Sequence, residues 1–192
     1  MTMKPHVRVL GIDDSPFRFG DNRSLVVGAL VRVPSYLEAV MKTVVTVDGK
    51  DSTERLIEMI SRSRYKEQVK AILLDGIALA GFNVVDIAAV HESLGLPVLT
   101  ITRDLPDIDA MRDALKKHFD DWRERYELVT RLELKQLSTS SKPLYAAGVG
   151  LEWREFQQLV SASTVRGVVP EPIRIAHLVA AAMAKGESKG RS

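Results

Sequence analysis

The chain contains no cysteine in its 192 residues. Disulfide bonds and thiolate metal sites are therefore excluded, and cysteine usage says nothing about the compartment. No stretch is apolar over the ~20 residues that a membrane span requires. The first ten residues, MTMKPHVRVL, lack the long apolar run of a secretory signal. We expect a cytoplasmic protein that has no membrane partner.

Charge is nearly balanced, because 27 Lys and Arg stand against 25 Asp and Glu for a net charge of +2. Such a small excess does not by itself indicate binding to nucleic acid. Hydrophobic residues make up 45% of the chain, which is enough for a domain of this length to bury a core. Because we find no repeat and no linker, we expect one domain over residues 1–186 and a disordered tail over 187–192.

The first quarter of the chain is rich in β-branched residues that alternate with other types. This pattern predicts strands over 6–13, 24–33 and 39–49. The connections between them are short and contain turn-forming residues. Short links favour antiparallel neighbours, so the three strands are expected to form a meander.

The pattern changes after residue 50. Apolar residues at helical spacing predict a helix over 51–67, and Gly95 closes a second helix over 83–95. Two nearly apolar segments, 68–76 and 96–103, are typical of buried strands. This alternation of strand and helix predicts a parallel βαβ unit.

The remaining third of the chain is mainly helical. Charged amphipathic patterns predict helices over 106–133, 151–163 and 171–186, with a loop at 139–143 and a short strand at 144–150. An antiparallel meander followed by parallel βαβ strands describes an α/β fold of the ribonuclease H-like type, a mixed sheet flanked by helices. A Rossmann-type domain would alternate from its start and carry a glycine-rich turn after its first strand.

Two carboxylates end predicted strands, Asp13 after VRVLGI and Asp75 after AILL. If these strands are neighbours, both carboxylates leave the sheet close together, and hard oxygen ligands suit Mg²⁺ or Mn²⁺. Asp14 follows Asp13, but successive side chains of a strand point to opposite faces. Only one of the two can therefore face a given site.

Three more residues are candidates for the same site. Asp51 and Glu54 open the first predicted helix, and His177 lies in the last one. Each has a structural alternative, because acidic residues are common in first turns and a histidine among apolar neighbours is often a core residue. The residues alone also leave open a proton-transfer site built from the same groups.

Three segments resemble endonuclease V, and more closely a related archaeal family described as endonuclease dU. GIDDSPF at 11–17 is similar to the first-strand motif G-V-D-x-S, and residues 71–103 are similar to the stretch that begins D-G-x-G-x-A-H-P. VRGVVPEPIRIAHL at 165–178 is similar to R-x-I-P-E-P-x-R-x-A-H. GFNVVD and DGKDST look like signatures of the closer family. Together these matches span roughly half the chain in the right order.

The resemblance implies a Mg²⁺-dependent endodeoxyribonuclease that nicks DNA at or near deaminated bases, with deoxyuridine favoured, and so acts in DNA repair. Position by position, Asp13 and Asp75 match the two metal-binding aspartates, and His177 matches the histidine of the last helix. Arg103 falls where endonuclease V has a lysine after its fifth strand, which implies contact with the scissile phosphate.

The chain departs from endonuclease V at three places. The glutamate motif near the first long helix is absent, so Asp51 and Glu54 both remain candidates for the third carboxylate. The strand-parting P-Y-x-P wedge is missing, and IALAGFN replaces x-A-H-P after Asp75. We therefore expect a different lesion pocket, for which Gly81, Phe82 and Asn83 are the candidate lining residues.

Two alternatives to the deoxyuridine reading remain. One is a nuclease that acts on inosine-containing DNA or RNA. The other is a catalytically silent nucleic-acid-binding module of the same fold, which the unmatched glutamate suggests. Metal binding and a substrate panel would separate the three. The oligomeric state is left open by the sequence.

Overall fold

The computed structural model describes residues 6–18, 20–139 and 142–189. The last three positions of the expected tail, 190–192, and two positions of the expected loop, 140–141, lie outside these ranges. Residues 187–189 carry no regular secondary structure, and α6 ends at Lys185. Among the described residues, no helix is both long and apolar enough to cross a membrane.

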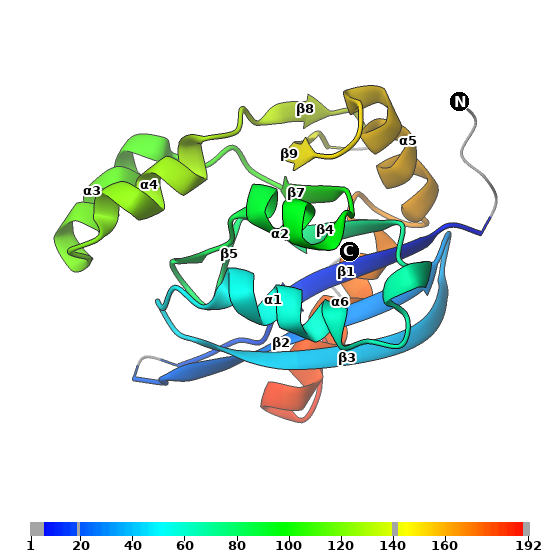
Figure 1. Cartoon of the computed structure of the whole chain (residues 1–192), viewed down its shortest axis with the longest axis horizontal. Coiled ribbons are helices and arrows are strands. Elements are labelled where there is room, and N and C mark those ends of the chain that lie inside the picture. The colour runs from blue at the N-terminus through cyan, green and yellow to red at the C-terminus, as the bar shows by residue number, and fades with distance from the viewer. Residues whose placement is uncertain (1–5, 19, 140–141, 190–192) are drawn as a thin grey trace.

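A seven-stranded mixed sheet forms the centre of the fold, in the order β3-β2-β1-β4-β7-β9-β8 (Figure 1). β1, β4 and β7 are parallel, and the other neighbouring pairs are antiparallel. The predicted meander and the parallel βαβ unit are therefore confirmed. The strands are β1 (Arg8–Asp14), β2 (Arg23–Arg32), β3 (Tyr36–Thr46), β4 (Ala71–Asp75), β7 (Val98–Thr102), β8 (Lys135–Leu137) and β9 (Leu144–Val149).

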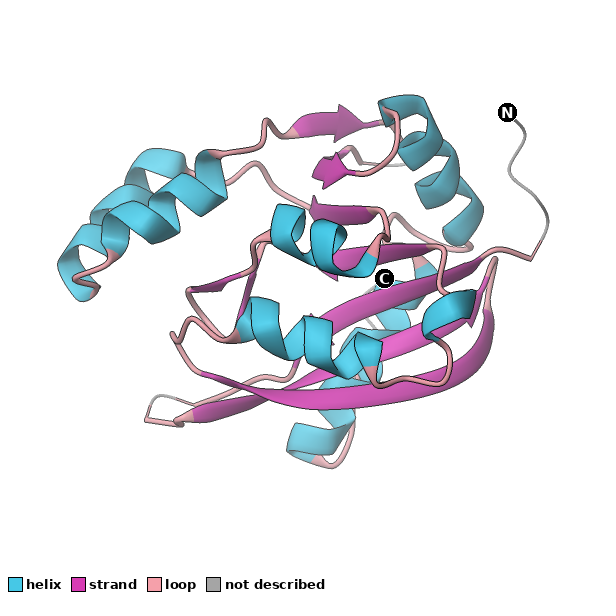
Figure 2. Cartoon of the chain, viewed as in Figure 1, coloured by secondary structure: helices cyan, strands magenta, loops and turns pink. Residues whose placement is uncertain are grey.

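Helices cover both faces of this sheet (Figure 2). α1 (Ser52–Ser61) and α2 (Ile87–Leu94) lie on one face, where they pack on a core that includes Leu10 and Ile12 of β1. α5 (Trp153–Ser163) and α6 (Glu171–Lys185) lie on the other, where the core includes Val9. Consecutive residues of β1 thus alternate between two buried faces, which is why the strand is apolar throughout.

A helical hairpin projects beyond the carboxyl ends of the parallel strands, on the left of Figure 1. It consists of α3 (Ile108–His118) and α4 (Trp122–Thr130), whereas one helix was predicted over 106–133. The chain becomes extended at Phe119, whose ring packs edge-on against Phe82 at 5.7 Å between centroids. A continuous helix would carry Phe119 away from this contact, which periodicity within the segment does not reveal.

Two boundaries and one short strand also differ from prediction. α1 ends at Ser61, and a short 3-10 turn (Lys66–Gln68) follows. The second predicted helix begins at Ile87 instead of residue 83, because β6 (Asn83–Val84) pairs with β5 (Ala78–Leu79) in a small hairpin. β8 was not predicted, because its three residues contain no repeat of an alternating pattern.

Candidate metal centre

Asp13 and Asp75 leave the sheet side by side. β1 and β4 are parallel neighbours, and Ile12 pairs with Leu74, so the next residue in each strand is a carboxylate at the same edge. Asp13 follows the face of β1 that carries Gly11, which packs against α6. The expectation that both carboxylates emerge together at the carboxyl ends of neighbouring strands is confirmed.

α6 brings His177 to the same place by touching the backbone of β1. A Cβ at residue 11 would lie 2.0 Å from the carbonyl carbon of Pro172, so only glycine permits this approach. At the start of the helix, Arg174 donates two hydrogen bonds to Glu171, at 2.7 and 2.8 Å. That pair lies within the first turn of α6, whereas the close approach of Pro172 to Gly11 fixes the helix across β1 and brings His177 to the end of the strand.

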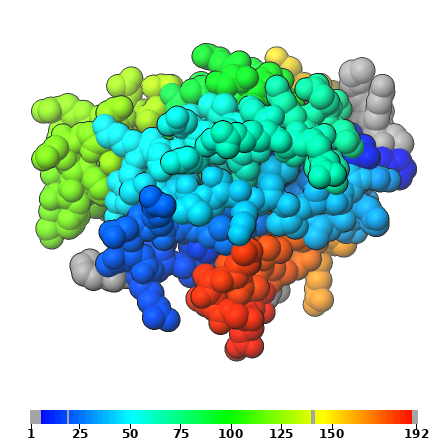
Figure 3. Space-filling model, turned by 60° about the horizontal axis from the view of Figure 1, so that its bottom comes forward, coloured from blue at the N-terminus to red at the C-terminus, as the bar shows by residue number. Residues whose placement is uncertain are grey.

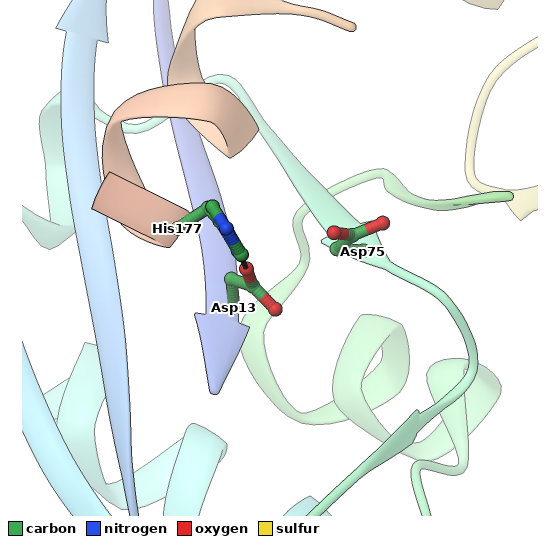
Figure 4. Close-up of side chains that lie close together, drawn as sticks. All are labelled: Asp13, Asp75 and His177. Atoms are coloured by element: carbon green, nitrogen blue, oxygen red, sulfur yellow. Dashed lines mark hydrogen bonds and ion pairs between the residues drawn. The ribbon is translucent and has the colours of Figure 1, made fainter. Parts of the chain in front are cut away.

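His177 and the two aspartates form one group (Figure 4). The His177 Nδ1 lies 2.7 Å from Asp13 Oδ2, and Figure 4 shows the imidazole pointing at that carboxylate while Asp75 faces it from the neighbouring strand. One potential ligand atom from each residue lies within 4.8 Å of the others. Two carboxylates and an imidazole at this spacing fit a divalent cation, and this group is the one of its kind among the described residues.

Asp14 points to the opposite face of the sheet. Its Oδ2 accepts a hydrogen bond from the Ala80 N–H at 3.1 Å, which ties β1 to the loop that follows β4. Burial raises the pKa of Asp14 to about 6, against the lowering effect of that hydrogen bond, and the charge of Asp75 adds a smaller increase. As the alternation of side chains along a strand requires, Asp13 joins Asp75 and His177 and Asp14 does not.

Asp51 and Glu54 are not brought into this group. Asp51 accepts hydrogen bonds from the Thr46 N–H at 3.0 Å and from Asn83 Nδ2 at 2.7 Å. Burial acts to raise the pKa of Asp51, but these hydrogen bonds outweigh it and lower the pKa. Asp51 therefore holds the turn between β3 and α1, and Glu54 is exposed in the first turn of α1. His177 joins Asp13 and Asp75, as the resemblance implied, whereas neither candidate for the third carboxylate lies with them.

The three residues assigned to a lesion pocket have internal partners. Asn83 is fully buried, donates to the Thr46 carbonyl at 2.8 Å and accepts from the Ser52 N–H at 3.0 Å. This corrects its assignment, because no surface remains on it for a base. Phe82 contacts the ring of Phe119, and Gly81 is exposed in a left-handed conformation where a Cβ would meet Asp48 at 2.2 Å.

Arg103 is exposed directly after β7, the strand next to β4. Its place at the same edge as Asp75 suits the phosphate contact expected of it, which stays a prediction.

A cavity of about 230 Å³ lies at the same edge and was not predicted. It begins at Gly76, the residue after Asp75, and is closed by Met111 and Val129 of the helical hairpin. Thr100 and Thr102 belong to a lining that is otherwise mostly apolar, and the Thr102 hydroxyl donates to the Asp104 carbonyl at 3.1 Å. The sequence signal that could have found this cavity is the presence of apolar residues, Ile108, Met111 and Val129, in a segment otherwise rich in charge.

A model of the endonuclease dU family matches residues 5–184. The chain belongs to the endonuclease dU family. Archaeal relatives span nearly the same length. A UPF0215 protein of Methanothermobacter thermautotrophicus is 41% identical over 98% of this chain and 93% of its own length. Another, from Thermococcus gammatolerans, is 40% identical over 97% of this chain and 96% of its own length.

Solved structures place this family member in the endonuclease V fold. A protein of unknown function from Archaeoglobus fulgidus is 37% identical, has a TM-score of 0.82, and covers 92% of this chain and 97% of its own. Endonuclease V of Ciona intestinalis, in complex with a DNA containing inosine, is 15% identical with a TM-score of 0.58 and covers 89% and 82%. The second likeness shows the fold alone, and it confirms the predicted ribonuclease H-like arrangement.

Proposed function

We propose that this endonuclease dU family member is a metal-dependent endonuclease that nicks DNA at or near deaminated bases, with deoxyuridine favoured. The observation that carries this proposal is the meeting of Asp13, Asp75 and His177 at the carboxyl edge of the parallel strands. The three residues come from segments far apart in the chain, and hard ligands gathered in this way suit phosphodiester hydrolysis.

The donor set indicates which ion fits. Asp13 and Asp75 offer carboxylate oxygens, the hard ligands that suit Mg²⁺ or Mn²⁺, and His177 lies beside them. When bound, such an ion supplies Lewis-acid stabilisation of the charge that develops on the phosphate. Asp13 and Asp75 would hold it, since they are the adjacent pair of hard ligands.

His177 has a role that follows from its hydrogen bond. Because Asp13 Oδ2 accepts from Nδ1, that nitrogen carries a proton in the neutral imidazole and Nε2 is then the basic atom. His177 is thereby oriented to take a proton from water or to position it beside the phosphate. Arg103, one strand further along the edge, would bind a phosphate oxygen as a charged donor.

The cavity beside Asp75 gives the base a place outside the helical stack. Enzymes that act at a particular base commonly extrude it, and extrusion costs least for damaged or mispaired bases. The cavity shares Gly76 with the chain that leaves Asp75, so a nucleotide whose phosphate is at the carboxylates would have its base nearby. Thr100 and Thr102 would lie beside it, and the Thr102 hydroxyl, which donates to the Asp104 carbonyl, would act towards the base as an acceptor.

A nicking assay tests the proposal. Labelled duplexes and single strands would carry deoxyuridine, deoxyinosine or no lesion, with deoxyinosine included because the Ciona intestinalis endonuclease V of the same fold was solved with an inosine-containing DNA. Inosine-containing RNA would complete the panel. We expect cleavage with Mg²⁺ or Mn²⁺, highest for deoxyuridine. Highest cleavage of an inosine-containing strand would move the proposal to that substrate.

Matched carboxylate variants make the test specific to the centre. Asp13→Asn should abolish cleavage and calorimetric Mn²⁺ binding, whereas Glu54→Gln, an exposed carboxylate on the first turn of α1, should keep both. Wild-type protein that binds nucleic acid but neither Mn²⁺ nor Mg²⁺ would favour the silent binding module. Loss of Mn²⁺ binding in a folded Glu54→Gln variant would contradict the ligand set.

A further inference from the structure

Phe17 is an exposed aromatic residue at the edge that carries the metal centre. It lies four positions after Asp13, in the connection between β1 and β2, and 38% of its surface is exposed. Among the described residues, the other strongly exposed aromatic is Tyr36. Tyr36 pairs with Arg32, at the end of the sheet where β1 begins, and is thus remote from the carboxylates.

The backbone that presents Phe17 is held rigidly. Ser15 is buried, and its N–H donates to the Leu25 carbonyl at 2.7 Å while its hydroxyl accepts from the Leu25 N–H at 3.2 Å. The Ser24 hydroxyl donates to the Ser15 carbonyl at 2.9 Å. Pro16 comes next and restricts the backbone further. These contacts fix the backbone that precedes the ring. The segment to which it belongs, drawn in blue, stands out at the lower left of Figure 3.

The Phe17 ring also touches the loop that leaves Asp75. A Cβ at Gly81 would lie 3.6 Å from Phe17 Cζ, so the tip of the ring sits against an exposed glycine. Asp48 accepts a hydrogen bond from the Phe82 N–H at 2.8 Å and so fixes this part of the loop. Phe17 thus stands between the chain that leaves Asp13 and the chain that leaves Asp75.

Packing against Gly81 accounts for only part of this position, because 38% of the Phe17 surface stays exposed. Full burial of a phenylalanine side chain stabilises a protein by about 1.5–3 kcal/mol, and the partly exposed ring forgoes part of that. A nucleobase, in contrast, has an apolar face that an aromatic ring can cover, and stacking of this kind is indifferent to base identity. Unstacking a base next to the cleaved bond leaves a neighbouring base face exposed.

We propose that Phe17 is a substrate-positioning residue that stacks on a nucleobase beside the cleaved bond and replaces the stacking lost there. The ligand is DNA with an unstacked base at the metal centre, so this inference rests on the proposed function. The stacking compensates for disruption of a duplex, so its contribution is larger for a lesion-containing duplex than for a single strand of the same sequence.

Variants at residue 17 and a matched control test the proposal. Phe17→Ala should weaken binding to a deoxyuridine duplex about tenfold, within the usual range for base–aromatic stacking. Phe17→Trp should restore binding, and Phe17→Leu, which keeps apolar bulk without a π-face, should not. Tyr36→Ala, which removes the other exposed aromatic, should bind like wild type.

Binding would be measured in EDTA, so that the result does not depend on cleavage, and steady-state kinetics would follow with Mg²⁺. The expected kinetic result is a higher KM with kcat changed less than about twofold, because stacking positions the substrate without entering the chemistry. Photocrosslinking to 5-iododeoxyuridine beside the lesion should map to the peptide that contains Phe17.

The outcomes separate this inference from the proposed function. A wild-type enzyme that cleaves while Phe17→Ala binds and cleaves equally well overturns the stacking role alone. Equal binding by Phe17→Leu and Phe17→Trp also overturns it, since bulk would then suffice. A protein that binds DNA through Phe17 without cleaving it supports the stacking role and overturns the nuclease, and a protein that binds no DNA overturns both.

Discussion

Two groups of polar residues lie near the carboxyl edge of the same sheet, on opposite faces. On the α6 face, Asp13 and Asp75 lie close to each other and to His177. On the α1 face, Asp51 is surrounded by donors, the Thr46 N–H and the Asn83 side chain. The first group brings two carboxylates and an imidazole close enough together for one cation, whereas in the second group Asp51 is held by hydrogen bonds from the chain itself.

This difference separates a binding site from a structural cluster of similar composition. Neighbouring carboxylates repel each other when no cation is bound, as the effect of Asp75 on the pKa of Asp14 shows, and this repulsion offsets part of the stabilisation from the contact between Asp13 and His177. A buried amide and a carboxylate that share hydrogen bonds do contribute, because removing one partner leaves buried polar groups unpaired. Substitutions in the two groups should therefore have opposite consequences for activity and stability.

The largest expected effect is at Asp75. Asp75→Asn should lower the cleavage rate by about 10³-fold, because a lost metal ligand removes several kcal/mol of transition-state stabilisation. The melting temperature should change little, because the isosteric amide keeps the shape of the side chain and removes a charge that opposes ionisation of Asp14. Single-turnover nicking and thermal melting measure the two quantities. A clear fall in melting temperature would place Asp75 with the structural group.

Substitution of His177 should also lower the cleavage rate, by less than substitution of Asp75. His177→Gln keeps a polar side chain but cannot take up a proton near neutral pH, and general-base groups typically contribute at least about 10²-fold. We expect about that loss in the single-turnover rate and retention of DNA binding. An unchanged rate would remove His177 from the chemistry and leave a structural contact with Asp13.

Asn83 tests the other side of the comparison. Asn83→Ala would leave the Ser52 N–H and part of the Asp51 carboxylate without their partners, at a cost of about 2 kcal/mol in the free energy of unfolding. Urea unfolding measures this loss. Calorimetric Mn²⁺ binding by the folded variant should match wild type, and a loss confined to Mn²⁺ binding would join the two groups into one site.

The smallest expected effect is on stability, at Asp121, a carboxylate whose hydrogen-bond donors are charged. Burial acts to raise the pKa of Asp121, but hydrogen bonds from Arg125 and Lys50 lower it to about 2. The stabilisation is complete above the unfolded value of 3.8 and is lost as pH falls toward 2. After allowance for solvent screening, Asp121→Asn should cost about 1 kcal/mol at pH 7.

A pH series of melting temperatures for the wild type and Asp121→Asn checks this prediction. The two proteins should differ at neutral pH, and the difference should shrink as pH falls from 3.8 through about 2, where half of the native carboxylate is protonated. A difference that is the same at every pH would mean that the side chain contributes through packing and not through charge.

The sequence predicted the order of strands and helices in the main sheet because alternation and helical spacing are local signals. It also placed Asp13 and Asp75 correctly, since parallel strands end at a common edge. His177 is 164 positions from Asp13, and only the resemblance to a known family joined them before the structure did. The break at Phe119 and the burial of Asn83 depend on partners distant in the chain, which no local pattern encodes.

Asp51 shows why residue type alone did not settle the third ligand. Its position at a helix start, near the edge of the sheet, was compatible with both a cap and a metal ligand. The choice depends on where Asn83 points, and that is fixed by the pairing of β5 with β6. The sequence showed that several acidic residues lie near this edge. Tertiary contacts decide which of them hold the fold, as Asp51 does, and which form the proposed metal site.

The direct contact of α6 with Gly11 has a consequence for the order in which the protein is made. β1 leaves the ribosome long before α6, and nothing else in the described chain takes the place of the helix against that strand. Asp13 is thus synthesised first but has no imidazole beside it until some 164 further residues have been added. A nascent chain with a folded amino-terminal meander would still lack His177, so the group of Asp13, Asp75 and His177 stays unassembled until α6 has emerged.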